Sequence, residues 1–411
     1  MAHVQPRQAL QERPRLREVA GRLVATMRSG MRVVRRWAFD RKHVVLPCAV
    51  LTVISAIWPA RATAAELEIR IDNPPVDRTV IAALFDSADT FVGLRNPVRI
   101  VTLPDGGRTP GRLRDLPPGE FALMVYVDEN GNGRLDKNFI GIPREPLGFS
   151  NRYWPQGPPV FRRAAFRLDE GETRTFDIEL RSVFGKRGLL GVGVGVIVQT
   201  SPYRGSSHTI VQPIPAISYV GERLQLLGPA ARFGLVNLGD VRLAATASYR
   251  VGAYAEDDSD ILQGLGDRDD TLMGGVAVQA ELPGGLILSA GYEHDLLDRV
   301  QGGQGRIRLS RAFQRGLVTA SPNLALDWLT AGLADYEYGV PPDQARDDRP
   351  AYRPGDAVVP ELGLNLFLEL SGTWRLVVNG SVGFLPSALT ESPIVDRSQV
   401  YKGFVAVIRM L

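Results

Sequence analysis

The sequence predicts an all-β protein whose larger part, residues 189–411, is an antiparallel transmembrane β-barrel of about twelve strands. Two observations predict this fold. Segments of about ten residues alternate between apolar and polar side chains, as strands between lipid and a lumen do. Short and long connections also alternate along the chain, as they do when tight periplasmic turns face extended external loops. No run of about twenty apolar residues offers a spanning helix instead.

Residues 241–251 show the alternation most clearly. One face carries only apolar or aromatic side chains, and a shift by one residue would place the arginines of the other face in lipid. Residues 272–282 and 361–370 alternate in a similar way. An arginine in lipid costs about 2–4 kcal/mol at the bilayer midplane. We therefore expect a group of strand arginines to face the lumen, namely Arg242, Arg250, Arg306 and Arg308.

The connections supply the second signal. Short turns fall at residues 220–222, 238–240, 283–285, 314–316 and 371–373. Longer loops fall between them, at residues 200–207, 252–271, 295–303, 330–357 and 386–398, with one short link near residues 228–230. The even strand number brings both ends of the barrel to the periplasmic side. A soluble β-sandwich or soluble barrel is the alternative that alternation and turn spacing leave open.

The first 65 residues form a basic N-terminus and a predicted signal peptide. They hold twelve Lys and Arg residues against three acidic ones, whereas the whole chain has a net charge of only +3. The apolar run at residues 44–59 follows basic residues and precedes Ala62-Thr63-Ala64, as in a secretory signal peptide. We expect cleavage after Ala64 or Ala65, with an uncleaved anchor helix as the alternative. Cleavage would remove this basic segment, so its charge does not indicate nucleic-acid binding. Cys48 leaves too, so the mature chain would contain no disulfide.

Residues 66–181 have the pattern of a separate β-sandwich, and residues 182–188 form a short linker to the barrel. Apolar β-rich runs at residues 79–85, 98–103, 121–127 and 175–180 are divided by Pro, Gly and Asp turns. About 115 residues suffice for an independent core. The topology of the barrel predicts that this domain lies in the periplasm.

A calcium loop is one interpretation of residues 128–136. Oxygen-bearing side chains at alternate positions, with Gly133 at the sixth, imitate the first half of an EF-hand loop. Phe139 stands at the twelfth position instead of the bidentate Glu, which would weaken the site. The alternative is a hairpin turn in which Asx side chains cap the backbone. No other cofactor is expected, and the candidate calcium ligands are Asp128, Asn130, Asn132, Arg134 (through its carbonyl) and Asp136.

Two families resemble parts of this chain. Residues 128–136, 138–145 and 148–151 resemble a bacterial domain of unknown function, domain 2141, over about residues 67–180. Four loop motifs of the barrel resemble the MipA/OmpV outer-membrane family, the MltA-interacting scaffold proteins. The motifs lie at residues 264–270, 338–345, 350–355 and 392–395. The second resemblance implies an outer-membrane location among outer-membrane lipids and a scaffold role for murein transglycosylases or synthases.

Catalytic motifs are weak in the predicted mature chain. It retains only His208 and His294, and the neighbours Ser207 and His208 would point to opposite faces of a strand. The glycines of residues 191–195 lack the features of a phosphate loop and suit a closely packed strand. We therefore expect a non-enzymatic scaffold or envelope interaction protein. A small-solute channel is the second hypothesis, and a lipid hydrolase acting through Ser207 and His208 is the third.

Overall fold

The computed structural model describes residues 64–155, 157–185, 187–206 and 209–411. The predicted signal peptide and Cys48 lie outside the described residues, as do Ser207 and His208. Within the described ranges, none of the helices has both the length and the apolar character needed to cross a membrane.

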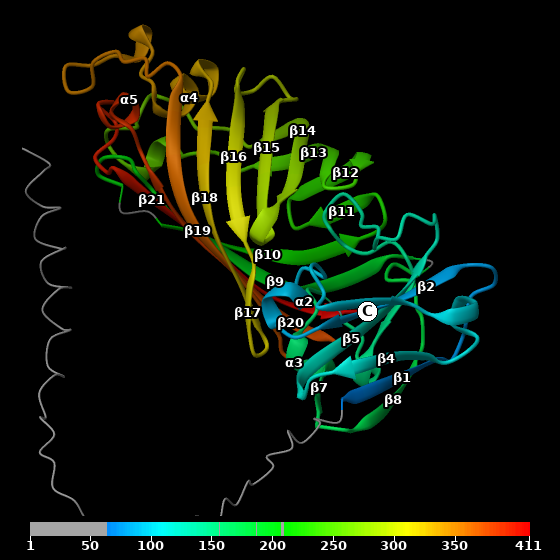
Figure 1. Cartoon of the computed structure of the whole chain (residues 1–411). Coiled ribbons are helices and arrows are strands. Elements are labelled where there is room, and N and C mark those ends of the chain that lie inside the picture. The colour runs from blue at the N-terminus through cyan, green and yellow to red at the C-terminus, as the bar shows by residue number, and fades with distance from the viewer. Residues whose placement is uncertain (1–63, 156, 186, 207–208) are drawn as a thin grey trace, which may run out of the picture. The chain divides into compact units, whose positions relative to one another are not determined.

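Residues 189–411 form a closed barrel of twelve antiparallel strands (Figure 1). Each strand pairs with the next along the chain, and β21 pairs with β9 to close the wall. β16 and β17 pair with the same neighbour and form one strand interrupted at Ala312. The strands are β9 (Leu189–Thr200), β10 (Thr209–Val220), β11 (Leu224–Leu227), β12 (Ala230–Leu238), β13 (Val241–Arg250), β14 (Thr271–Leu282), β15 (Leu286–Asp295), β16 (Gly303–Arg311), β17 (Phe313–Arg315), β18 (Val318–Leu329), β19 (Ala357–Glu369), β20 (Trp374–Phe384) and β21 (Gln399–Met410).

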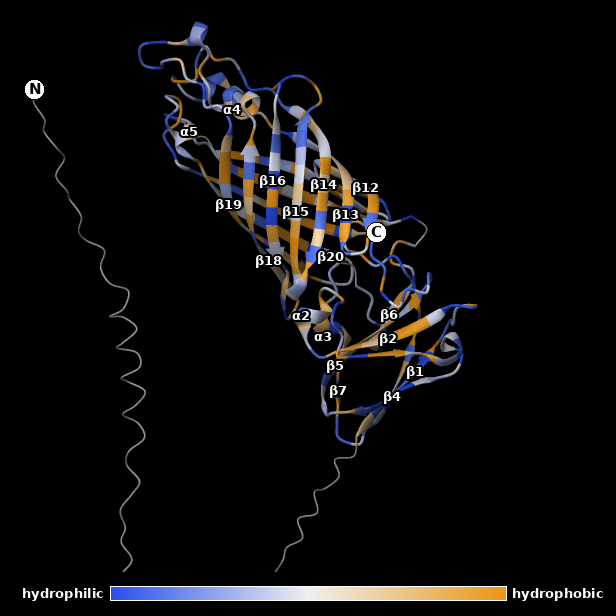
Figure 2. Cartoon of the chain, turned by 45° about the horizontal axis from the view of Figure 1, so that its top comes forward, coloured by the Kyte–Doolittle hydropathy of each residue, from blue (hydrophilic) through white to orange (hydrophobic). Residues whose placement is uncertain are grey.

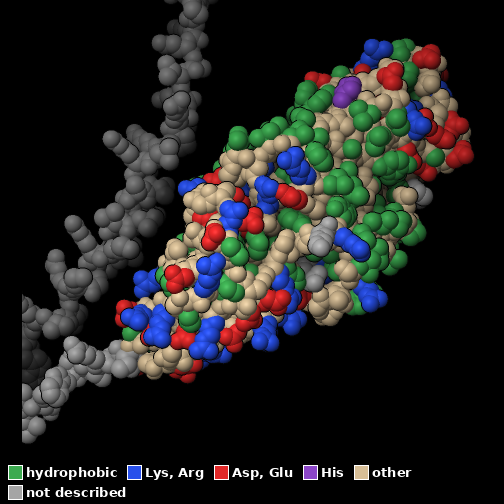
Figure 3. Space-filling view, turned by 90° about the vertical axis from the view of Figure 1, so that its right-hand side faces the viewer, with side chains coloured by type: hydrophobic (Ala, Val, Ile, Leu, Met, Phe, Trp, Pro, Cys, Tyr) green, Lys and Arg blue, Asp and Glu red, His purple; other side chains and the backbone are tan. Residues whose placement is uncertain are grey.

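The wall of the barrel is apolar outside and polar inside. Val194 on the outer face is 73% exposed, whereas Arg242 on the inner face is 3% exposed. Figure 2 shows this alternation along the strands, and Figure 3 shows hydrophobic side chains spread over the wall between charged ends. The predicted inward direction of the strand arginines is confirmed. A soluble barrel would bury apolar side chains inside, so the observed arrangement excludes that alternative for residues 189–411.

The glycines of β9 face the lumen at the seam where the barrel closes. A Cβ atom added to Gly193 would lie 1.9 Å from the carbonyl oxygen of Val407 on β21. Inside this seam, Ala216, Ala406, Ile408 and Met410 pack into a small apolar cluster. The glycine spacing therefore reflects close packing of strands, as predicted.

Residues 65–178 contain two further sheets, which pack face to face. One has the order β4-β1-β8, with β8 parallel to β1, and the other has the order β3-β2-β5-β6, with β7 also paired to β5. Their inner faces share one apolar core, as expected for a sandwich. The strands are β1 (Ala65–Ile71), β2 (Thr79–Phe85), β3 (Arg99–Thr102), β4 (Gly111–Leu116), β5 (Gly119–Asp128), β6 (Leu147–Phe149), β7 (Ala165–Leu168) and β8 (Thr173–Ile178).

The larger sheet is buried on both faces. Its second face is covered by α2 (Ala88–Phe91), α3 (Phe161–Ala164) and the segment around Trp154. Phe91 packs edge-on against Phe85, Phe149 and Phe161. Burial on both faces explains why β2 and β5 are continuous apolar runs and do not alternate.

The long loops fold together into an apolar cap at the outer end of the barrel. They carry α4 (Ala331–Tyr338) and α5 (Ser387–Thr390), and their buried side chains form one cluster with the strand ends. Tyr203 is at its centre, 2% exposed, and packs against Tyr254 and Tyr338. Short 3-10 helices complete the chain at η1 (Pro104–Gly107), η2 (Ser150–Arg152), η3 (Glu256–Asp258), η4 (Pro283–Gly285) and η5 (Pro342–Gln344).

Candidate functional site

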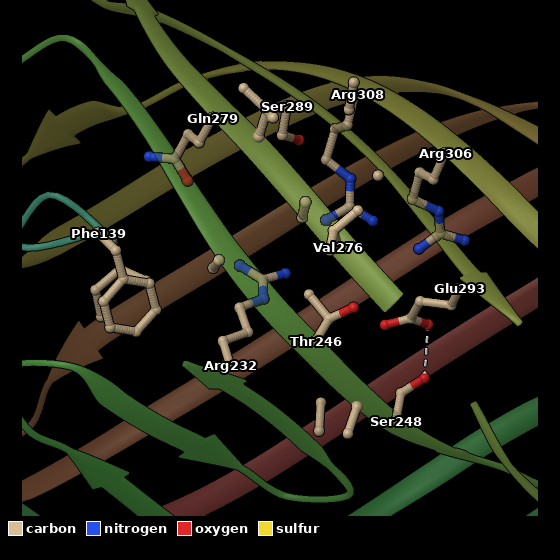
Figure 4. A pocket seen from close by; sticks show the side chains of 18 of the residues that line it. Phe139, Arg232, Thr246, Ser248, Val276, Gln279, Ser289, Glu293, Arg306 and Arg308 are labelled. Atoms are coloured by element: carbon tan, nitrogen blue, oxygen red, sulfur yellow. Dashed lines mark hydrogen bonds between the residues drawn. The ribbon is translucent and has the colours of Figure 1, made fainter. Parts of the chain in front are cut away.

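The lumen holds a cavity of about 250 Å³ whose wall carries four arginines among mainly small apolar residues (Figure 4). The wall comes from β12 to β16, whose inward positions carry the lining side chains. Period-two alternation places a residue from every second position of each strand in this cavity. Its principal polar lining residues are Arg232, Arg242, Thr246, Ser248, Gln279, Ser289, Glu293, Gln304, Arg306 and Arg308.

Three of the inward arginines pair with carboxylates on other elements. Arg242 Nη2 lies 2.6 Å from Glu281 Oε1, and Arg306 makes a two-pronged contact with Asp327. At the outer end, both Nε and Nη2 of Arg250 donate to Glu337 of α4, at 2.8 and 2.5 Å. Paired guanidinium and carboxylate groups offset part of the cost of removing each charge from water.

Other charged groups in the lumen make no such pair. Among the described residues, the side chains of Arg232, Arg308 and Lys402 have no hydrogen bond or ion pair within contact distance. Glu293 accepts a hydrogen bond of 2.7 Å from Ser248. Arg308, Lys402 and Glu361 line a second cavity of about 480 Å³ beside the first. Arg232 and Lys402 were absent from the sequence-based prediction, although the alternation of β12 and β21 would have placed both inside.

A loop of the front domain enters the periplasmic mouth of the barrel. Phe139, which takes the place of the twelfth calcium ligand, is 5% exposed and lines the lumen cavity together with Ile140. A Cβ atom on Gly234 of β12 would lie 2.7 Å from the Phe139 ring, so the ring packs directly on the inner wall. The side-chain amide of Asn138 donates to the carbonyl oxygen of Gly221, in the short turn after β10, at 3.2 Å. We refer to residues 137–142 as the entry loop.

Other parts of the front domain contact the same rim of the barrel. Gln314 in β17 donates to the carbonyl oxygen of Pro159 and accepts from the Phe161 amide, both at 2.7 Å. On β19, Glu369 accepts a hydrogen bond from Tyr153 at 3.4 Å and lies 3.8 Å from Arg163. These contacts are distributed over several strands, so the front domain covers part of the mouth from two sides.

Lys137 of the entry loop lies in a charged cluster at the mouth. Its Nζ lies 3.7 Å from Glu281 Oε2, and Arg95 approaches the same oxygen at 3.7 Å. Burial lowers the pKa of Lys137, and the positive charges of Arg95 and Arg242 act in the same direction, whereas Glu281 opposes them. Glu281 thus connects the barrel wall with two cations of the front domain.

The candidate calcium ligands form a compact turn. Both carboxylate oxygens of Asp128 accept backbone amides, from Gly131 at 2.8 Å and from Gly133 at 2.7 Å. The side-chain amides of Asn130 and Asn132 donate to the two oxygens of Asp136, at 2.7 and 3.1 Å. The carboxyl oxygens of the turn therefore already act as acceptors, and the structure shows the predicted Asx capping.

Glu145 holds the two ends of this turn together and was not predicted from the sequence. Its carboxylate is 2% exposed and accepts the amides of Glu129 and Asp136, each at 2.9 Å. Burial raises the pKa of Glu145, and the two amide donors counteract that effect.

Calcium binding by the turn stays a prediction, and calorimetry on the whole protein in detergent tests it. If calcium binds, millimolar calcium gives a saturable heat that Asp136→Asn reduces, because a carboxylate ligand is lost while the side-chain shape is kept. Asp72→Asn, which removes a carboxylate outside the turn, should leave the heat unchanged. If the unsubstituted protein gives no saturable heat, the calcium prediction is wrong and residues 128–136 form only a capped turn.

The ion pair between Arg250 and Glu337 is expected to hold the outer cap on the barrel. Glu337→Ala leaves Arg250 without its carboxylate partner. The loss should destabilise the closed cap by about 1–3 kcal/mol, so that the cap opens about tenfold more often. Limited tryptic digestion of the outer loops measures this opening. Glu391→Ala removes an exposed acid of the same cap and is the matched control. Equal digestion rates for the two variants would contradict the assignment.

The remaining histidine of the described chain gives no catalytic arrangement. His294 is exposed on the outer face of β15, and its Nδ1 lies 3.0 Å from the hydroxyl of Tyr292. Its ring points toward the lipid side, away from the lumen acids. The hydrolase hypothesis also required Ser207 and His208, which lie outside the described residues.

Comparison with known families agrees with this architecture. Residues 192–410 match the model of the MltA-interacting protein MipA family, which covers more than half of the chain. The chain belongs to this family. Residues 69–175 match an uncharacterized protein domain conserved in bacteria, DUF2141. Both resemblances predicted from the sequence are thereby confirmed.

Three relatives show how far the similarity extends. YiaT of Escherichia coli (strain K12) is 29% identical over 52% of this chain and 87% of its own length. The MltA-interacting protein of the same strain is 28% identical over 51% of this chain and 84% of its own length. The outer membrane protein OmpV of Vibrio cholerae is 25% identical over 39% of this chain and 62% of its own length. Each of these first two relatives matches over most of its own length but over only about half of this chain.

Membership of the family places this MipA-family barrel in the outer membrane. The chain enters β9 at the end of the short turns, which face the periplasm in such barrels. The front domain precedes β9 and contacts these turns. The front domain thus lies at the end of the barrel that carries the short turns, and its position in the periplasm stays a prediction.

Proposed function

We propose that the protein is a non-enzymatic outer-membrane scaffold that presents its front domain to cell-wall enzymes in the periplasm. The observation that supports this most strongly is the docking of the front domain on the barrel mouth through Phe139, Gln314 and Glu369. A domain fixed at the membrane surface in this way can hold a partner at a set distance from it. A relative is named as an MltA-interacting protein, which points to a murein transglycosylase as the kind of partner.

The outer face of the sheet β4-β1-β8 is the surface that we assign to the partner. It carries side chains of both charges, with the exposed Arg112 and Arg114 beside the half-buried Glu66. Exposed ion pairs of this kind contribute about 0–1 kcal/mol to stability. They set the orientation and the rate of association with a charged partner.

Site-specific crosslinking in cells tests this function. A photoreactive residue at Arg114 should capture a murein transglycosylase or synthase, identified by mass spectrometry. The same residue at Asp347, an exposed position of the outer cap, should capture none. If Arg114 and two further positions on this sheet capture no cell-wall enzyme, the scaffold function is wrong.

A small-solute channel is the second candidate, and the arginine-rich lumen favours it. Ion-selective, steady conductance of the whole protein in planar bilayers would support it. The scaffold function predicts no steady conductance, because the entry loop and the outer cap occupy the two ends of the barrel.

A further inference from the structure

The lumen has positive groups that its own carboxylates do not pair. Arg306 is matched by Asp327, Arg242 by Glu281 and Arg250 by Glu337. Arg232, Arg308 and Lys402 remain, and in the described part of the chain only Glu293 and Glu361 face them in the two adjoining cavities. One positive charge is therefore in excess around this water-accessible space.

Arg232 and Arg308 converge on the same point. They come from β12 and β16, which lie on opposite sides of β13, β14 and β15 in the wall. Figure 4 shows their guanidinium groups pointing toward one another across the cavity, with Arg306 beside them. The charges of Arg306 and Arg232 both act on Arg308. Like charges brought this close repel unless an anion lies between them.

One hydrogen-bonding group of Arg308 is also unsatisfied. Its Nε is buried and finds no acceptor among the described residues. A buried donor without a partner is unfavourable, and the guanidinium group carries five donors in a planar fork that matches the oxygens of a phosphate or carboxylate. The hydroxyl of Ser289 and the amide of Gln279 line the same cavity and can complete the coordination of an oxyanion.

We propose that Arg232 and Arg308 form a binding site in the lumen for a small oxyanion, the phosphate or carboxylate group of a solute. The nearby carboxylates limit the charge that the site accepts. Glu293 acts on Arg232, and Glu361 acts on Arg308 and Lys402. Singly charged oxyanions therefore fit the excess of charge. This site is independent of the proposed scaffold function, which depends on the outer face of the front domain.

Titration calorimetry of the whole protein in detergent with inorganic phosphate tests the site, with acetate as the second probe. The unsubstituted protein should bind phosphate saturably. Arg232→Gln combined with Arg308→Gln should weaken binding about tenfold or more, because two charged donors are lost. Arg315→Gln removes one positive charge at the exposed end of β17, away from the cavity, and should bind phosphate as the unsubstituted protein does.

A second variant is expected to strengthen phosphate binding, so that the test does not depend on a loss of binding alone. Glu293→Gln lowers the negative charge beside Arg232 and should tighten phosphate binding about threefold. Gel mobility before and after heating reports whether each variant folds. The proposal is wrong if neither probe binds, if the arginine variants bind as tightly as Arg315→Gln, or if Glu293→Gln does not tighten binding.

Discussion

Replacement of Gly193 by valine is expected to prevent the barrel from closing. Gly193 faces the lumen from β9, and its backbone lies so close to β21 that an added Cβ atom would be 1.9 Å from the carbonyl oxygen of Val407. The obstructing atom belongs to the backbone, so no side-chain rotation relieves the clash. Overpacking in a well-packed interior costs about 1–3 kcal/mol or more, and here it acts on the only seam that joins the two ends of the sheet.

The yield of folded, heat-modifiable protein measures this effect, and we expect about a tenfold loss for Gly193→Val. Gly380→Val is the matched control, because Gly380 lies in β20 of the same wall and an added Cβ atom there has no atom within 4 Å. If both valine variants assemble equally well, the seam at β9 and β21 tolerates more separation than the structure implies.

Local periodicity explains why most of the barrel could be predicted. Each strand faces lipid on one side and the lumen on the other, so its sequence alone fixes the direction of Arg242 and of Arg306. Turn residues such as Gly239 and Gly284, both at positive φ, mark the connections as clearly. Neither signal depends on contacts between residues far apart in the chain.

The parts that could not be predicted depend on such distant contacts. Phe139 was interpreted only as a missing calcium ligand, whereas it packs on Gly234 nearly a hundred residues later. The parallel pairing of β1 with β8 joins the two ends of the front domain. Glu145 is likewise positioned by the fold, and its role as an acceptor for Glu129 and Asp136 has no local sequence signature.

The entry loop belongs to the front domain and lies outside residues 192–410, which match the MipA family model. YiaT corresponds over 87% of its length to about half of this chain. We expect the barrel wall to fold without the front domain, because strands β9 to β21 pair only with one another. The entry loop instead changes what the lumen can exchange with the periplasm, because Phe139 and Ile140 line the same cavity as Arg232 and Arg308.

Removal of residues 66–181 is therefore expected to open the lumen to reagents from the periplasmic side. Ser289→Cys places a thiol in the cavity, in a protein produced without its only native cysteine, Cys48. Burial of a side chain such as Phe139 contributes about 1.5–3 kcal/mol. A small thiosulfonate reagent should then label Cys at position 289 about tenfold faster or more in the shortened protein than in the whole protein. The Phe139→Ala variant of the whole protein should be labelled at an intermediate rate.

Thr373→Cys in an exposed periplasmic turn is the control, and its labelling rate should be the same with and without the front domain. Labelling at position 289 that is equally fast in the whole and the shortened protein would show that the entry loop does not restrict access. That result would remove the main argument against the channel, since the outer cap would then be the only barrier along the lumen. A slow rate in the whole protein and a fast rate without the front domain would instead mean that oxyanions reach Arg232 and Arg308 only when the front domain moves.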